Sequence, residues 1–210
     1  MRRALLLLAV AAGVAAPAAA QDDPPGFSIR PFVLGTHQTF TAIETFDGVF
    51  ERHRAPFVGG GVQVVFWDRL VAEVGASRFR MIGERAFHSG GKTFRLGIPL
   101  TATITPLEVT GGYRLPMWEH ARPYVAAGYT SYAYQETSDF SAPEENIDTR
   151  RPGFVVSGGL EFRIGNWVGL SADAQYSRVK EILGAGGLSQ QVGETDLGGV
   201  AVRVKLIVGR

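Results

Sequence analysis

A strict alternation of apolar and polar residues in Gly153–Leu183 constrains the fold of this chain more than any other feature. The clearest part places Val168, Leu170, Ala172, Ala174 and Tyr176 on one side, and Ser171, Asp173, Gln175 and Ser177 on the other. A period of two is typical of a β-strand with one apolar and one polar face. The short segment Gly165–Trp167 joins this strand to the alternating run before it, which predicts an antiparallel hairpin. The hairpin alone leaves open which face is inside, because a soluble sandwich buries its apolar face and a membrane barrel turns that face to lipid.

The first twenty residues have the parts of a secretory signal peptide. Met1-Arg2-Arg3 is basic, Ala4–Ala16 is apolar, and the segment ends with small residues at Ala20. We therefore expect cleavage after Ala20, a short polar leader over residues 21–26, and one barrel domain over residues 27–210. No later segment has the roughly 18 consecutive apolar residues of a transmembrane helix. Without Arg2 and Arg3, 19 Lys and Arg residues remain against 20 Asp and Glu, and no basic block suggests nucleic-acid binding.

Eight segments in total have the character of strands. They are Phe27–Phe40, Pro56–Trp67, Leu70–Arg85, a part of Thr93–Leu115, Pro123–Thr137, the two halves of the hairpin, and Glu194–Val208. Within the fourth, Pro99 and Pro106 predict a bulge or a late start. The connections after the odd-numbered strands are the longer ones, namely Thr41–Ala55, Ala86–Lys92, Ser138–Arg151 and Gly184–Gly193. An even strand count with alternating short and long connections predicts an all-β, eight-stranded antiparallel up-and-down transmembrane barrel.

Two further sets of residues fit a membrane barrel. The three tryptophans, Trp67, Trp118 and Trp167, lie in or beside the short connections, where they are expected to form an aromatic ring at one membrane interface. Charged residues also occur in mid-strand on the polar faces. We expect them to fill the narrow lumen and neutralise one another: Glu73, Glu108, Arg114, Glu161, Arg163, Asp173, Arg203 and Lys205.

With these features together, the chain resembles the small OmpA/OmpW-like outer-membrane barrels. The resemblance rests on the signal Met1–Ala20, on Arg30–Val33 and Gly59–Val64, and on the hairpin residues Gly158–Arg163 and Gly169–Ala174. It implies a bacterial outer-membrane location, a monomer, and outer-membrane lipid and the barrel-assembly machinery as partners. The chain departs from the family in two respects. It ends Val208-Gly209-Arg210 without a terminal aromatic residue, and we expect no peptidoglycan-binding domain after the barrel.

No motif in the sequence predicts catalysis, a metal site or a cofactor. Gly90-Gly91-Lys92-Thr93 resembles the end of a phosphate-binding loop, but Ala86 occupies the position of the first glycine and a strand is expected to follow. The four histidines have no helical i, i+4 pair of the kind that binds zinc. Gly169–Asp173 lacks the last glycine of a nucleophile elbow. We therefore predict no catalytic, cofactor-binding or metal-binding residue, and no enzymatic activity.

Four functions remain open from the sequence. The first is a structural or surface-interaction role through the external loops, with Thr41–Ala55 and Ser138–Arg151 as the expected contact surfaces for an unidentified external ligand. The second is a narrow channel for small or hydrophobic solutes, which the OmpW-like resemblance implies. The third is a lipid-modifying barrel enzyme, and the fourth is a soluble barrel that binds a ligand in an apolar interior.

Overall fold

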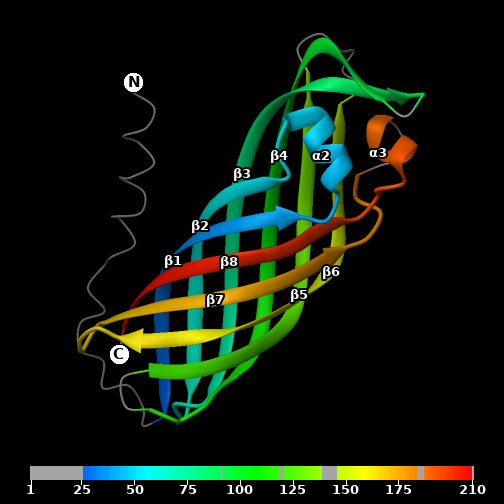
Figure 1. Cartoon of the computed structure of the whole chain (residues 1–210). Coiled ribbons are helices and arrows are strands. Elements are labelled where there is room, and N and C mark those ends of the chain that lie inside the picture. The colour runs from blue at the N-terminus through cyan, green and yellow to red at the C-terminus, as the bar shows by residue number, and fades with distance from the viewer. Residues whose placement is uncertain (1–25, 91, 119–120, 139–145, 184–186, 210) are drawn as a thin grey trace, which may run out of the picture.

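The fold is a closed antiparallel barrel in which every strand pairs with its neighbours in sequence and the first pairs with the last (Figure 1). The computed structural model describes residues 26–90, 92–118, 121–138, 146–183 and 187–209. The signal peptide and all of the leader except Gly26 lie outside these residues, so their boundaries stay predictions. Among the described residues, no helix is long and apolar enough to cross a membrane.

The eight predicted strands are confirmed, although several are longer than expected. They are β1 Phe27–Phe40, β2 Arg54–Phe66, β3 Leu70–Ser89, β4 Lys92–Arg114, β5 Ala121–Thr137, β6 Ile147–Arg163, β7 Val168–Val179 and β8 Leu197–Val208. Two short helices, α2 Ile43–Phe50 and α3 Gly187–Val192, lie at the end of the barrel with the longer connections (Figure 1). The central hairpin of the prediction corresponds to β6 and β7, which pair from Gly153↔Val179 to Arg163↔Gly169.

Alternation along the strands separates an inner polar face from an outer apolar face. In β8, Val200, Val202 and Val204 are exposed on the outside, whereas Arg203 and Lys205 are buried inside. β7 follows the same pattern, because Ser171, Asp173, Gln175 and Ser177 are all buried. A soluble protein buries its large apolar side chains. The outward position of these valines therefore identifies the outer face as the one that meets lipid.

For the fourth strand, the sequence predicted either a bulge or a late start, and the structure has the irregularity without the late start. β4 is continuous from Lys92, so a late start is wrong. The register between β3 and β4 shifts between Glu84 and Ala86, directly beside Pro99, which confirms an irregularity at that proline. Gly97 has a φ of 68° there, a backbone conformation that glycine adopts without a steric penalty. Pro106 causes no such shift, since the register is the same on both sides of it.

Three connections predicted as loops are partly ordered into regular structure. Ala86–Lys92 is mostly strand, because β3 runs to Ser89 and β4 starts at Lys92. In Ser138–Arg151, β6 already begins at Ile147, and residues 139–145 lie outside the described part. In Gly184–Gly193, residues 187–192 form α3.

The largest departure from the sequence prediction is Thr41–Ala55, which we expected to be a polar external loop. It contains α2, whose Phe46, Val49 and Phe50 are buried. Their spacing of three and four residues places them on one face of a helix. That face is the centre of a large apolar cluster inside the external half of the barrel. The other members come from the strands and from the β7–β8 connection, and include Phe40, Phe57, Phe79, Met81, Ile104, Tyr132, Tyr134, Ile182, Leu188 and Leu197.

Candidate functional site

The candidate site is the interior of the barrel. A charged network occupies the half toward the short connections, the expected periplasmic half, and α2 covers the half toward the longer connections, the expected external half. The register of the strands brings the charged side chains together. Asp173 pairs with Arg203, and Ser171 pairs with Lys205, across β7 and β8. Residues directly opposite one another in an antiparallel pair have side chains on the same face. Both cations therefore project into the lumen beside acceptors of β7.

Lys205 forms the first group of contacts. Its Nζ atom lies 2.6 and 2.7 Å from the two carboxylate oxygens of Glu73 on β3, and 3.8 Å from Asp173. The ammonium also lies 5.2 Å from the ring centre of Phe32 and 5.9 Å from that of Tyr124. Lys205 is only 2 % exposed. Burial of this kind is tolerated because the ammonium has carboxylate partners and aromatic faces around it.

Arg203 and Asp173 form the second group. Arg203 donates a hydrogen bond to Asp173 at 2.5 Å and another to Glu108 on β4 at 3.1 Å. Gln175 donates to the second oxygen of Glu108 at 2.7 Å, and Tyr124 donates to Asp173 at 2.5 Å. One arginine thus connects β8, β7 and β4 across the lumen.

Arg114 and Glu161 form the third group, together with a residue that the sequence analysis missed. Arg114 lies 2.6 Å from Glu161, and Arg30 of β1 lies 2.8 Å from the same oxygen and hydrogen-bonds Gln63. Arg30 has the same parity along β1 as the buried Phe32 and Leu34. Reading the period of two along Phe27–Phe40 would therefore have placed it in the lumen.

Arg163 is the one predicted lumen residue that stands apart from these contacts. It is exposed at the last position of β6 and forms no ion pair with another described residue. The reason is its height in the barrel, since the strand ends there and the side chain is beyond the buried part of the lumen. The other seven predicted residues are brought together in the three groups.

The three groups balance in charge. Inside the lumen, four carboxylates (Glu73, Glu108, Glu161, Asp173) contact four cations (Arg30, Arg114, Arg203, Lys205). Burying an unpaired charge lowers the free energy of unfolding by roughly several kcal/mol. Equal numbers of cations and carboxylates in direct contact avoid this cost. Among the described residues, no group of three or more His, Asp or Glu side chains is placed to hold a metal ion.

The helix α2 is held in the external mouth of the barrel from both ends. The carboxylate of Glu194 accepts hydrogen bonds from the backbone N–H groups of Glu44 and Thr45, at 3.2 and 2.8 Å. Arg95 of β4 donates to the carbonyl of Gly48 at 3.0 Å and contacts Glu51 near the other end. A negative group at a helix N-terminus and a positive group at its C-terminus both stabilise the helix. α2 is therefore a docked element rather than an open loop.

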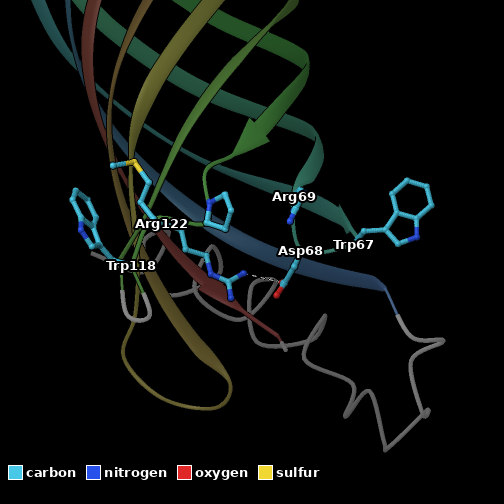
Figure 2. A pocket seen from close by; sticks show the side chains of 7 residues that line it. Trp67, Asp68, Arg69, Trp118 and Arg122 are labelled. Carbon is cyan, nitrogen blue, oxygen red and sulfur yellow. Dashed lines mark ion pairs between the residues drawn. The ribbon is translucent and has the colours of Figure 1, made fainter.

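The three tryptophans all lie at the opposite end of the barrel, in the short connections. Each is more than half exposed. Trp67 and Trp118 lie on either side of an open pocket of about 460 Å³ that Asp68, Arg69, Pro116, Met117 and Arg122 also line (Figure 2). The position at one end fits the predicted aromatic ring, whose contact with a membrane interface stays a prediction.

Asp68 and Arg122 form an ion pair in this pocket, with a distance of 2.8 Å between nitrogen and oxygen (Figure 2). The hydrogen bond from Arg122 holds the pKa of the Asp68 carboxyl below its ordinary value. Partial burial opposes this shift, and the charges of Arg114 and Arg163 add to it. Asp68 therefore stays ionised at neutral pH and fixes the position of Arg122.

Comparison with known proteins agrees with this architecture. The sequence profile of the outer membrane protein beta-barrel domain matches residues 6–203. The chain belongs to this family. Its members are located in the bacterial outer membrane, so the apolar outer face of this barrel contacts lipid. A soluble barrel with an apolar ligand-binding interior is therefore wrong for this chain, because its exposed valines face lipid and its lumen is charged.

Several solved outer-membrane barrels are similar in fold. Ail, the attachment invasion locus protein of Yersinia pestis, in complex with the heparin analogue sucrose octasulfate, has a TM-score of 0.54 and 10% sequence identity, with 89% of this chain and all of Ail covered. The N-terminal barrel of OprF from Pseudomonas aeruginosa has a TM-score of 0.45 and 13% identity, with 86% of this chain and 96% of that one covered. At these identities the likeness concerns the fold alone. No curated protein matches the chain.

Proposed function

We propose that this protein is a filled, non-catalytic outer-membrane barrel that presents its external end to a partner at the cell surface. The observation that carries the proposal is the contrast between the two parts of the molecule. The interior is occupied by paired charges and an apolar cluster, whereas β3 and β4 continue past α2 as a protruding hairpin (Figure 1). Side chains available to a partner are therefore on the outside of the external end.

The protruding hairpin has one face that is attached and one face that is free. The backbone N–H of His88 donates to Gln191 of α3 at 2.6 Å, and Arg95 binds α2, so this face is fixed to the helices. On the other face Phe87 and Phe94 stack with their ring centres 5.3 Å apart, and both are exposed. Exposed aromatic pairs on a rigid support are typical of interaction surfaces.

This assignment shifts the expected contact surface. The sequence analysis favoured Thr41–Ala55, but α2 in that segment directs its phenylalanines into the barrel. The hairpin tip therefore replaces Thr41–Ala55 in the proposal. We also propose that the barrel is a monomer, since the pairing of β1 with β8 closes the sheet around the lumen without a second copy.

The test is retention of bacteria that display the protein. Cells with the wild-type protein or with Phe87→Ser/Phe94→Ser are measured for binding to immobilised heparin, chosen because Ail was crystallised with a heparin analogue, and for aggregation with one another. We expect the double variant to lose at least one of these interactions, while Val58→Ser, which changes a more exposed apolar residue on β2, keeps both. Unchanged binding and aggregation in the double variant would contradict a surface role for the hairpin.

A narrow channel is the competing function. It requires a continuous polar path through the lumen, and the apolar cluster around α2 lies across that path.

A lipid-modifying enzyme, a second competing function, requires a nucleophile, a base and an acid in contact. In the described lumen, the buried Ser171 and Ser177 instead hydrogen-bond tyrosines, at 3.0 and 2.9 Å. Neither the apolar cluster nor the serine contacts favour a channel or an enzyme over surface presentation.

A further inference from the structure

On β2, β3, β6 and β7 the outward residues change from apolar to basic toward the longer connections. On β7 the outward residues are apolar from Val168 to Tyr176, the next outward residue is Arg178, and Lys180 follows directly after the strand. On β3 they are apolar from Leu70 to Ala76, and the next two are Arg78 and Arg80. The first outward cation thus follows four or five apolar positions on both strands. Outward cations also follow the apolar run on β2 and β6, as Arg54 and Arg150.

The change coincides with the edge of the membrane. The eight residue steps from Val168 to Tyr176, at about 3.3 Å each and a strand tilt of about 40°, span roughly 20 Å along the barrel axis. This approaches the apolar band of about 25 Å that outer-membrane barrels present to lipid. The tryptophans are at the other edge of this band. The outward cations are therefore at the level of the external lipid headgroups.

Arg78 and Arg80 are two outward cations at successive outward positions of one strand. Both are exposed, and neither forms an ion pair with another residue in the described part of the chain. Arg178, the first outward cation on β7, differs because it binds Asp196 at 2.8 Å. Residues two apart on a strand project from the same face about 7 Å from one another. The two guanidinium groups can therefore reach one anion together.

The neighbouring strand completes the surroundings of these arginines. Thr103 of β4 is directly opposite Arg80 but is buried, and Thr105, the next outward residue on that strand, is partly exposed. Toward the periplasm, Leu107 and Val109 follow on the same face, and both are exposed to lipid. A ligand at this place would meet two guanidinium groups and the hydroxyl of Thr105 above, and an apolar wall below. That pattern fits a molecule with a phosphate attached to acyl chains, and not a soluble anion.

We propose that Arg78 and Arg80, with Thr105, bind the phosphate of a phosphorylated lipid headgroup in the external leaflet. Guanidinium groups bind phosphate oxygens in a bidentate manner, which gives both strength and orientation. The site is on the barrel wall rather than on the protruding hairpin. It therefore goes beyond the proposed surface function and would hold the barrel at a fixed depth and rotation in the membrane.

The test measures lipid binding to the purified full chain in phosphatidylcholine nanodiscs. Lipid A, which carries phosphates on a glycolipid, is compared with its fully dephosphorylated form by native mass spectrometry. We expect the wild-type protein to retain lipid A in preference to the dephosphorylated form. Arg78→Gln/Arg80→Gln is expected to weaken retention by about tenfold or more, because two charge-assisted contacts are lost. Arg78→Lys/Arg80→Lys should restore part of it, and Arg178→Gln, whose cation already has a partner, should change it little.

Three outcomes would overturn the proposal. Equal binding of the two lipids by the wild-type protein would mean that the phosphate is not recognised, and this comparison needs no variant to fold. An equal loss in Arg178→Gln would indicate general surface charge rather than a site. Displacement of lipid A by inorganic phosphate at millimolar concentration would identify a site for the free anion. Heat-modifiable migration on SDS gels confirms that each variant is folded before it is compared.

Discussion

At the scale of single residues, the account depends on charges that are buried with their partners. Lys205 contacts Glu73 in the closed interior, and Arg203 contacts Asp173 and Glu108. Removal of one partner leaves the other buried and uncompensated, which is more costly than the pair itself is stabilising. The period of two in the sequence placed these residues in the lumen, since each falls between apolar positions. It could not give their pairing, because the partners are on different strands and depend on register.

Lys205→Met is expected to lower the free energy of unfolding by about 3–5 kcal/mol, because Glu73 loses its ammonium partner in the lumen. The measurement is urea unfolding of the refolded protein in lipid vesicles. The double variant Lys205→Met/Glu73→Gln should lose less than the sum of the two single variants, since no charge is then left alone.

Arg163→Gln is the matched control for this prediction, because Arg163 is a cation on an inward-facing position that lies beyond the buried network. Its effect should stay within about 0.5 kcal/mol. Equal destabilisation by Lys205→Met and Arg163→Gln would contradict the assignment of Lys205 to the buried network.

Asp68 gives a pH dependence whose sign follows from its lowered pKa. The ion pair with Arg122 contributes to stability above the unfolded-state pKa of about 3.9, and this contribution is lost as the pH falls through the lower pKa of the folded state. The stability difference between the wild-type protein and Asp68→Asn should thus be constant from about pH 5 to 8 and shrink below about pH 4. Asp68 is largely exposed, so the difference should be under about 1 kcal/mol. A difference that grows on acidification would contradict the pair.

At the scale of elements, α2 is the part that sequence reasoning missed. Eight strands were predictable, because each repeats the alternation several times. α2 has only eight residues, so its apolar spacing covers about two turns and Gly48 interrupts the helical composition. Its stability comes from tertiary contacts, which are the Glu194 carboxylate, the Arg95 guanidinium and the apolar cluster. None of these is local in sequence, which is why the segment was expected to be a polar loop.

Gly83→Ala tests the docking of α2, because a Cβ atom at Gly83 would clash with the carbonyl of Val49 and the ring of Phe50. We expect a loss of about 1–3 kcal/mol and faster proteolysis within α2, with the barrel itself still closed. Gly111→Ala on β4 is the control, since a Cβ there meets no atom within 4 Å. If both variants leave the proteolysis of α2 unchanged, α2 does not pack on β3 as described.

Glu194→Gln tests the same element from its other end. The substitution removes the negative charge from the N-terminus of α2 and keeps the size of the side chain, so a loss of roughly 0.5–1 kcal/mol is expected. Amide hydrogen exchange of Glu44 and Thr45 should become faster, because their N–H groups donate to Glu194. Unchanged exchange at both amides would show that the carboxylate does not hold the helix.

At the scale of the whole molecule, the lumen of the barrel is occupied by two different kinds of side chain. Paired charges cross the periplasmic half, and the α2 cluster occupies the external half. Tyr132 of that cluster hydrogen-bonds Ser177 of β7 at 2.9 Å. The fold class and the lipid-facing surface followed from the sequence pattern. The filling of the external half did not, and it is this part that favours surface presentation over conduction.

Conductance across a planar bilayer tests the filled lumen most directly. The purified protein, shown to be folded by its heat-modifiable migration, is inserted into the bilayer and held at a series of voltages. A barrel closed by the charge network and by α2 should give no discrete current steps above the bare bilayer. Reproducible unit steps from the wild-type protein would contradict the account and identify the lumen as a channel.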